Sequence, residues 1–256
     1  MKIGRFRQKE DKNGIFYGSL SPDGSFVNVM THFDFEDLNY TGRQYFLSEL
    51  DFLSPCETTK IVAVGVNYKD HAEEMNKKLP EVPLLFIKPS SSVIAHLERI
   101  VLPKSSVRVN YESEFAIVMA KKAKNVKISE APDYILGYTC LNDVTARDLQ
   151  TKDVQFTRAK GFDTFAPVGP FIETEIKDPL NLAVKGYLNG ELRQSSNTSN
   201  LIFGPYELVE FISGIMTLFP GDIISTGTPS GVGSLKSGDV FEIEIDNIGR
   251  LKNFVE

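Results

Sequence analysis

The stretch that decides the fold of this chain is Tyr111-Glu112-Ser113-Glu114-Phe115-Ala116-Ile117-Val118-Met119. Side chains alternate between the two faces of a β-strand, so a strand here places Glu112 and Glu114 on one face, and the run that follows is apolar, as in a buried strand. Two carboxylates this close repel one another unless water or a cation lies between them. The stretch therefore predicts either a polar strand face in solvent or a site for a hard divalent cation, which prefers oxygen ligands.

Strand candidates surround this stretch, and only a few short helices separate them. The apolar runs lie at 60–66, 84–88, 137–142, 222–226 and 240–246, and the helix candidates are 68–77, 131–136 and 205–218. Asn189-Gly190 stands between two short runs and predicts a hairpin with a type I′ turn. Because strands and helices do not alternate regularly, the pattern predicts the α+β class instead of a doubly wound parallel sheet.

The first fifty-odd residues predict a small β module. The runs 15–20 and 26–29 flank Ser21-Pro22-Asp23-Gly24, whose proline and glycine suit a hairpin turn. We interpret 45–53 as a connecting segment. We therefore divide the chain into a small N-terminal β module, 1–58, and a main domain, 59–256.

Composition excludes several classes of partner. The chain has 256 residues and a net charge of −6, and its only basic cluster is Lys121, Lys122 and Lys124. This argues against nucleic acid or an anionic membrane as the main partner. No apolar segment has the length of a signal peptide core or a membrane span, so a soluble protein that is not exported is expected. Cys56 and Cys140 are too few for a disulfide framework or a zinc site, which favours reduced thiols and a cytoplasmic location.

An apolar strand candidate ends abruptly in Asn142-Asp143. Asp143 is either the N-cap of the turn that follows or a third carboxylate beside the two glutamates. Arg147 and Gln150 follow four and seven residues later, so a helix here puts all three on one stripe, with a cation and an amide beside the acidic cluster. The alternative for Arg147 is a surface ion pair.

His71 and Glu74 stand three residues apart on the predicted helix 68–77, close enough to touch. They form either a surface pair of little energetic value or a general base, in which the carboxylate orients the imidazole and raises its basicity. His32 and His96 have no comparable neighbours, and we interpret both as structural.

Two further segments carry polar groups suited to an anionic ligand. Lys160 precedes a flexible turn that contains aromatic residues, and 225–233 is a loop rich in hydroxyls and glycines after a strand. That loop lacks both a Gly-Lys-Ser/Thr ending and a G-x-G-x-x-G pattern, which excludes a nucleotide site. Its N–H and O–H donors, including Thr228, can still hold a substrate carboxylate.

Six different sequence blocks follow one another along the chain in a characteristic order. They read Gly65-Val66-Asn67-Tyr68-Lys69-Asp70-His71-Ala72-Glu73-Glu74, Phe86-Ile87-Lys88-Pro89, Tyr111-Glu112-Ser113-Glu114, Asn142-Asp143-Val144-Thr145-Ala146-Arg147-Asp148-Leu149-Gln150, Ala159-Lys160-Gly161-Phe162-Asp163-Thr164 and Thr226-Gly227-Thr228-Pro229-Ser230-Gly231-Val232-Gly233. Together they resemble the fumarylacetoacetate hydrolase family over about residues 60–256. The resemblance implies a mixed β-roll of that family's C-terminal type for 59–256, and a homodimer.

The resemblance also implies roles for particular residues. It implies a divalent metal, Mg²⁺ or Mn²⁺, held by Glu112, Glu114 and Asp143. It implies that His71 and Glu74, on a mobile lid helix, activate water or shuttle a proton. The remaining matched positions contact substrate, with Lys160 adding positive charge at the reacting oxygen: Lys160, Arg147, Gln150 and Thr228.

Chemistry and resemblance together predict a metal-dependent hydrolase or lyase that acts on a small 2-oxo or 2,4-dioxo carboxylic acid through a metal-bound enolate. The expected outcomes are C–C bond hydrolysis of the acylpyruvate type or decarboxylation of the oxaloacetate type. The alternatives are an isomerase or hydratase of 2-hydroxyhepta-2,4-diene-1,7-dioate type intermediates in aromatic catabolism, and a ureidoglycolate-type lyase. A non-catalytic β-rich binding protein is the alternative of another class, and it predicts neither a metal requirement nor a loss on replacing His71.

Overall fold

The largest sheet is built around the acidic stretch. The computed structural model describes residues 1–11, 13–31 and 39–256. In it β11 (Ser113–Met119) is buried along its whole length, with antiparallel β12 and β17 on its two sides. Since both faces of this strand are covered, its residues after Glu114 must be apolar. The other strands on this side of the sheet are β6 (Lys60–Gly65), β7 (Leu84–Pro89), β12 (Ile135–Asn142), β14 (Ala166–Glu173) and β17 (Ile223–Ser225).

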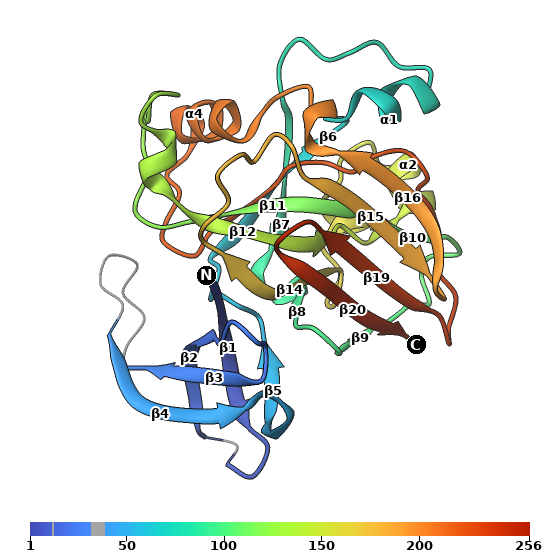
Figure 1. The fold of residues 1–256 in the computed structure, drawn as a ribbon. Coiled ribbons are helices and arrows are strands. Elements are labelled where there is room, and N and C mark those ends of the chain that lie inside the picture. Colours follow the sequence, from blue (N-terminus) through green and yellow to red (C-terminus); the bar gives the residue numbers. More distant parts are fainter. Residues whose placement is uncertain (12, 32–38) are drawn as a thin grey trace.

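A second sheet packs on the first and encloses the main core (Figure 1). Its order is β16 (Glu191–Asn197), β15 (Ala183–Leu188), β19 (Val240–Ile245), β20 (Gly249–Val255) and β9 (Arg99–Ile100). Asn189 and Gly190 both have positive φ, 52° and 82°, which confirms the predicted turn between β15 and β16. The α+β class with mixed sheets is confirmed.

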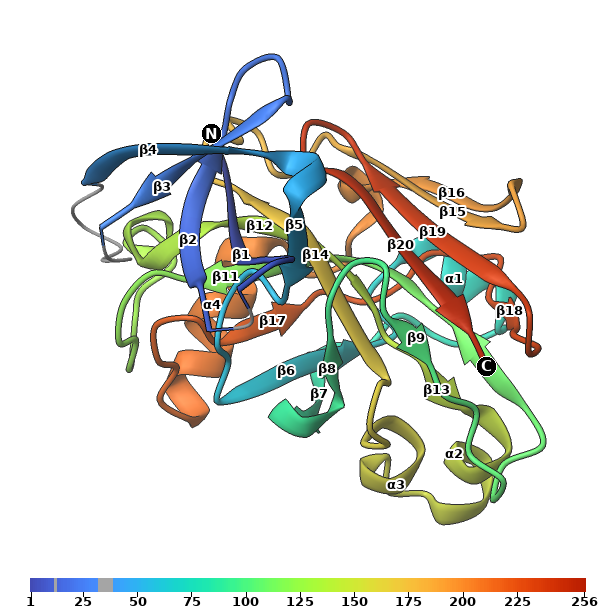
Figure 2. The ribbon, with the colours of Figure 1, turned by 90° about the horizontal axis from the view of Figure 1, so that it is seen from below.

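Helix α4 (Pro205–Ile215) covers the sheet near β11 and buries Leu208, Val209 and Ile212. It ends three residues before the predicted boundary. The other helices are short: α1 (Lys69–Glu74), α2 (Arg147–Asp153), α3 (Thr157–Lys160) and the 3₁₀ turns η1 (Leu47–Glu49), η2 (Ser90–Ser92), η3 (Ala131–Tyr134) and η4 (Thr198–Asn200). Figure 2 shows α2 and α3 side by side at one end of the molecule. No helix in the described ranges combines the length and apolarity that crossing a bilayer requires.

The strand predicted over 111–119 is interrupted at Glu112. The short β10 (Val109–Tyr111) belongs to a separate three-stranded sheet with β13 (Thr145–Ala146) and β18 (Gly233–Ser234). The break has a cause distant in the sequence, because the Glu112 N–H donates to the side chain of Asn142 at 3.0 Å instead of to a backbone carbonyl of a neighbouring strand. Glu112 therefore lies at the junction of two sheets, where its side chain can turn toward a shared cavity.

The N-terminal module contains the predicted hairpin, β2 (Ile15–Leu20) and β3 (Phe26–Met30), beside β1 (Lys2–Gln8). The prediction of a connecting segment at 45–53 is wrong. The chain there forms the end of β4 (Tyr40–Phe46), η1 and β5 (Leu50–Leu53), because Leu50 is 3% exposed and β5 pairs with β1. β1 also pairs with β14, so backbone hydrogen bonds join the module to the large sheet. The division at residue 58 stays a prediction, and His32 lies outside the described residues.

His96 joins the module to the main domain. Its Nδ1 accepts from the Lys252 N–H at 3.0 Å, and its ring meets the Phe52 ring edge-on at 4.8 Å between centroids. The short β8 (Val93–Ile94), which pairs with β14, precedes it. Burial, aided by the Lys252 charge, lowers the pKa of His96 from 6.5 to about 4.

This pKa predicts a pH dependence of stability. Between pH 6.5 and 4 His96 is protonated in the unfolded chain and stays neutral in the folded chain. The free energy of unfolding therefore falls as the pH falls through this window. Denaturant unfolding at pH 7 and pH 5 should show a larger loss for the wild type than for His96→Gln, which keeps an acceptor and cannot titrate. Equal losses in the two proteins would contradict the prediction.

Candidate active site

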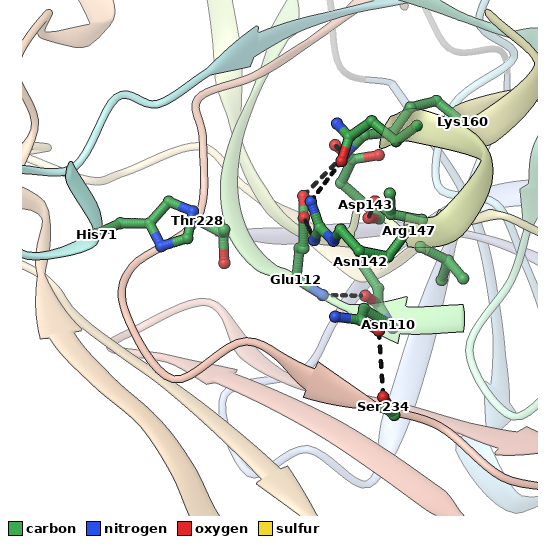
Figure 3. A network of polar contacts seen from close by, with 12 residues as sticks. His71, Asn110, Glu112, Asn142, Asp143, Arg147, Lys160, Thr228 and Ser234 are labelled. Carbon is green, nitrogen blue, oxygen red and sulfur yellow. Dashed lines mark hydrogen bonds and ion pairs between the residues drawn. The ribbon is translucent and has the colours of Figure 1, made fainter. Parts of the chain in front are cut away.

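The predicted site residues lie around one cavity of about 270 Å³. All of them line it except Glu74, which stands behind His71. A larger hollow of about 460 Å³ beside Met1 and Glu173 contains none of them. Figure 3 shows His71 on one side of the site and Glu112, Asp143, Arg147 and Lys160 on the other. The predicted lining residues are His71, Glu112, Glu114, Asp143, Arg147, Gln150, Lys160 and Thr228, and Met75, Lys77, Leu84, Phe86, Thr151 and Phe156 also line the cavity.

Three buried carboxylates meet at one end of this cavity. Glu112, Glu114 and Asp143 each offer one oxygen, and these oxygens lie within 4.8 Å of one another. Oε2 of Glu114 accepts hydrogen bonds from the Ser225 hydroxyl and from the Gly227 N–H at 2.9 Å, both of them neutral donors. No ion pair joins Glu114 to any residue that the structure describes. Burial, together with the charges of Asp143 and Glu112, raises the pKa of Glu114 well above its usual range.

Cationic side chains hold the other two carboxylates. The Lys160 ammonium donates to Glu112 Oε2 at 2.8 Å and to Asp143 Oδ2 at 2.5 Å. Arg147 pairs with the other oxygen of Glu112 and donates to Gln150 Oε1 at 2.6 Å. Burial alone would raise the pKa of Glu112, but Lys160 and Arg147 outweigh it and hold that pKa far below its usual range. Burial likewise opposes the Lys160 charge, yet Asp143 and Glu112 raise the pKa of Lys160 above its usual value.

Lys88 is a site residue that the sequence reasoning missed. It lies near the end of β7, is 0% exposed, and donates to Asp143 Oδ1 at 2.6 Å and to the Val144 carbonyl at 3.1 Å. Burial lowers its pKa and the Asp143 carboxylate opposes that shift. The available signal was a lysine on the same strand face as Phe86, at the end of an apolar run.

Two expectations around Asp143 need correction. Asp143 is not a helix N-cap, since α2 begins at Arg147 and its N-cap position is Ala146. Asp143 is therefore not on a helical stripe with Arg147 and Gln150, and it reaches the site from the end of β12. Only Arg147 and Gln150 share the helix, and they touch. Lys160 forms the last residue of α3, with its ammonium 4.9 Å from the centroid of the Phe86 ring.

The His71 and Glu74 side chains are in contact on α1. Nδ1 of His71 lies 3.1 Å from Glu74 Oε2, and the other Glu74 oxygen accepts from the Gly231 N–H at 3.1 Å. A proton on Nδ1, shared with Glu74, leaves the lone pair on Nε2. The ring can therefore accept a proton on the nitrogen that does not face Glu74.

A buried glutamine supports the loop that carries Thr228. Gln194 on β16 accepts from the Ser113 N–H and donates to Thr228 Oγ1, both at 2.9 Å. The Thr228 hydroxyl in turn donates to the Ser113 carbonyl at 3.0 Å, so donation to a substrate requires that bond to break. Beside it, Gly227 has φ +98°, and a Cβ there would come within 2.9 Å of the Asn67 Cβ. Sequence reasoning missed Gln194, whose partners are distant in the chain.

The acidic cluster suits a hard divalent cation. Its donor set is three carboxylates, the ligand type that Mg²⁺ and Mn²⁺ prefer. Glu112 and Asp143 have basic partners, whereas Glu114 is 2% exposed and is held by neutral donors alone. A buried carboxylate in this state is costly unless a cation neutralises it. The residues present therefore fit a metal ion at Glu112, Glu114 and Asp143.

Comparison with known proteins gives relatives of several enzymatic types. A protein of Methanocaldococcus jannaschii is 54% identical over 91% of this chain and 98% of its own length. The rat mitochondrial oxaloacetate tautomerase Fahd2a is 41% identical over 81% of this chain and 70% of its own length. The crystal structure of 5-carboxymethyl-2-hydroxymuconate delta-isomerase from Mycobacterium smegmatis is 40% identical with a TM-score of 0.93, covering 100% of this chain and 99% of that one.

A fourth relative was solved with ligands. Fumarylpyruvate hydrolase from Pseudomonas aeruginosa, in complex with Mn²⁺ and pyruvate, is 31% identical with a TM-score of 0.74, covering 79% of this chain and 90% of that one. The family model for the fumarylacetoacetate (FAA) hydrolase C-terminal domain matches residues 60–256, the part that contains the whole cavity lining. The chain therefore belongs to the fumarylacetoacetate hydrolase family.

Proposed function

We propose that this protein is a divalent-metal-dependent enzyme that removes and returns a proton next to the 2-oxo group of a small 2-oxo dicarboxylic acid, with oxaloacetate as the first substrate to test. One observation carries the proposal: a small cavity has three carboxylates at one end and the His71–Glu74 pair on the facing side. The 41% identity to oxaloacetate tautomerases supports this choice of substrate.

Glu112, Glu114 and Asp143 would hold Mg²⁺ or Mn²⁺. When bound, the ion supplies a Lewis acid that polarises the 2-oxo group of the substrate. The complex of the Pseudomonas hydrolase with Mn²⁺ and pyruvate supports a metal and a 2-oxo acid in the same site.

The side chains divide the remaining work. Lys160 and Arg147 place positive charge at the carboxylate end, which favours the enolate over the neutral ketone. Nε2 of His71 takes the proton from the carbon beside the 2-oxo group, and the enolate oxygen gains a proton from water to give the enol. In the enol-to-keto direction the enol O–H loses its proton to water, and the protonated Nε2 returns a proton to that carbon. Glu74 holds the other ring nitrogen and stabilises the imidazolium that forms between these two steps.

Lys77 provides the preference for a second carboxylate. It lines the cavity, and none of the ion pairs within the described ranges involves it, whereas Arg147 and Lys160 are already paired with carboxylates. A free ammonium at the exposed edge of the cavity attracts an anionic group on the substrate. We assign it to the distal carboxylate of the 2-oxo dicarboxylic acid.

Hydrolysis of an acylpyruvate is the second candidate, favoured by the likeness to fumarylpyruvate hydrolase. In that reaction His71 takes a proton from water instead of from carbon, and a C–C bond breaks. Decarboxylation of oxaloacetate and isomerisation of a hydroxymuconate-type acid pass through a similar enolate. Selectivity among these outcomes is proposed to lie in 75–83 and 151–157. A homodimer and a cytoplasmic location also stay predictions.

Chelation should abolish the conversion of enol to keto oxaloacetate, and added Mn²⁺ should restore it. Glu114→Gln should lower the metal-dependent rate at least about 100-fold, because it removes a charged ligand. The decay of enol absorbance measures both effects. Glu210→Gln, an exposed change on α4, serves as the control and should behave like the wild type. Full turnover in chelator would rule out the metal mechanism.

His71→Asn should lower kcat about 100- to 1,000-fold with little change in KM, since it removes the proton acceptor and leaves the binding groups. Exchange of the C3 protons of pyruvate in D₂O, followed by NMR, isolates the proton transfer. His96→Gln is the matched control and should exchange normally. Unchanged exchange in His71→Asn would rule out His71 as the proton acceptor, whereas wild-type exchange no faster than in buffer alone would favour the non-catalytic binding protein.

Lys77→Met should raise the KM for oxaloacetate about tenfold, the worth of one hydrogen bond to a charged group. The rate of pyruvate C3 exchange should stay unchanged, because pyruvate has no second carboxylate. Lys78→Met changes the neighbouring lysine, which does not line the cavity, and should leave both values alone. Parallel losses with pyruvate and oxaloacetate would contradict the assignment of Lys77.

A further inference from the structure

Lys88 is a fully buried charge that the proposed reaction does not use. It does not line the cavity, so it cannot touch a substrate there. Its strand, β7, is hydrogen-bonded to β6 with Lys88 opposite Ile61, and Pro89 follows directly. The position of the Lys88 backbone is therefore fixed by the sheet, and only its ammonium reaches the site.

The ammonium of Lys88 contacts two neighbouring acceptors. It donates to the side chain of Asp143 and to the carbonyl of Val144, the next residue. The main chain there is itself anchored, because the Asp143 N–H donates to the Glu112 carbonyl at 3.0 Å and the Val144 N–H to the Phe165 carbonyl at 3.1 Å. Lys88 thus adds a restraint that the backbone cannot supply, on the Asp143 carboxylate itself.

The two oxygens of Asp143 are used differently. Oδ1 accepts from Lys88, and Oδ2 accepts from Lys160, whose ammonium also contacts Glu112. Oδ2 is therefore the oxygen on the side of Glu112, with which it shares the Lys160 ammonium. Rotation of the carboxylate would break the 2.6 Å bond to Lys88 before it could bring Oδ1 to that side.

Stability alone is a weak reason for a lysine here. Exchanging a buried ion pair for apolar side chains is often neutral or stabilising, because both charges lose their hydration. Lys160 already supplies Asp143 with one positive partner. A second, fully buried ammonium on the same carboxylate therefore contributes more to the orientation of the carboxylate than to the balance of charge.

We propose that Lys88 is a positioning residue: it holds Oδ1 of Asp143 so that Oδ2 is presented, with Glu112 and Glu114, to a divalent cation. The inference rests on the metal site of the proposed function and deepens it.

The alternative role, a simple counter-charge, predicts the opposite effect on metal binding. Removing a positive charge beside a carboxylate strengthens its attraction for a cation. Removing a positioning contact weakens binding, and loss of an outer partner of a metal ligand commonly costs about 10- to 100-fold in affinity. The sign of the change in Mn²⁺ affinity therefore separates the two roles.

The experiment is calorimetric titration of the metal-free full-length protein with Mn²⁺. Lys88→Met is expected to raise the Kd at least about tenfold relative to the wild type. Lys60→Met is the matched control, since Lys60 also lies in a strand of the large sheet and pairs with the buried Asp222, away from the cavity. It should leave the Kd within about twofold, whatever it does to the thermal midpoint.

Each result decides the matter. Equal or tighter Mn²⁺ binding by folded Lys88→Met would overturn the positioning role while leaving the metal site intact. No binding by the wild type would overturn the metal site, and this inference with it. If Lys88→Met does not fold, Lys88→Arg is measured instead, because it keeps the charge and moves the hydrogen-bond donors. Mn²⁺ binding that is weaker by about threefold or more supports the positioning role. Unchanged binding overturns it.

Discussion

Three buried carboxylates share one cavity, and their mutual repulsion is the constraint on which the rest of this structure depends. Away from water this repulsion is strong, and burial adds a cost for each charge. Lys88, Lys160 and Arg147 offset the charges of Asp143 and Glu112. Glu114 receives no such partner within the described residues and is held by a hydroxyl and a backbone N–H. This uneven compensation is what makes the cluster suited to a further cation.

The fold meets the constraint by bringing unrelated elements to one point. Glu112 lies where two sheets join, Glu114 is the second residue of β11, and Asp143 follows the end of β12. The strands position the three carboxylates, whereas the short helices α1, α2 and α3 bring the groups that we propose to act on a substrate (Figures 2 and 3). Such a division suits chemistry that needs fixed charge at one end of a cavity and a movable proton acceptor at the other.

Features of the fold and of the site could be predicted where their causes are local. His71 and Glu74 touch because a helix places residues three apart on one face, and Asn189-Gly190 turns the chain because both residues accept positive φ. The break at Glu112 could not be predicted in this way. It depends on the Asn142 side chain, 30 residues away, which takes the N–H that a continuous strand would have used.

The sequence by itself determined the α+β class, the apolar interior strands, and the residue types that gather at the cavity, through the order of its six blocks. Only the tertiary structure decided which lysine or arginine side chain contacts which carboxylate. Lys88 reaches Asp143 across 55 residues, and Gln194 reaches Ser113 across 81. The physical reason is that side-chain period and turn chemistry act over a few residues, whereas charge compensation acts through space, between whichever side chains the packed sheets bring together.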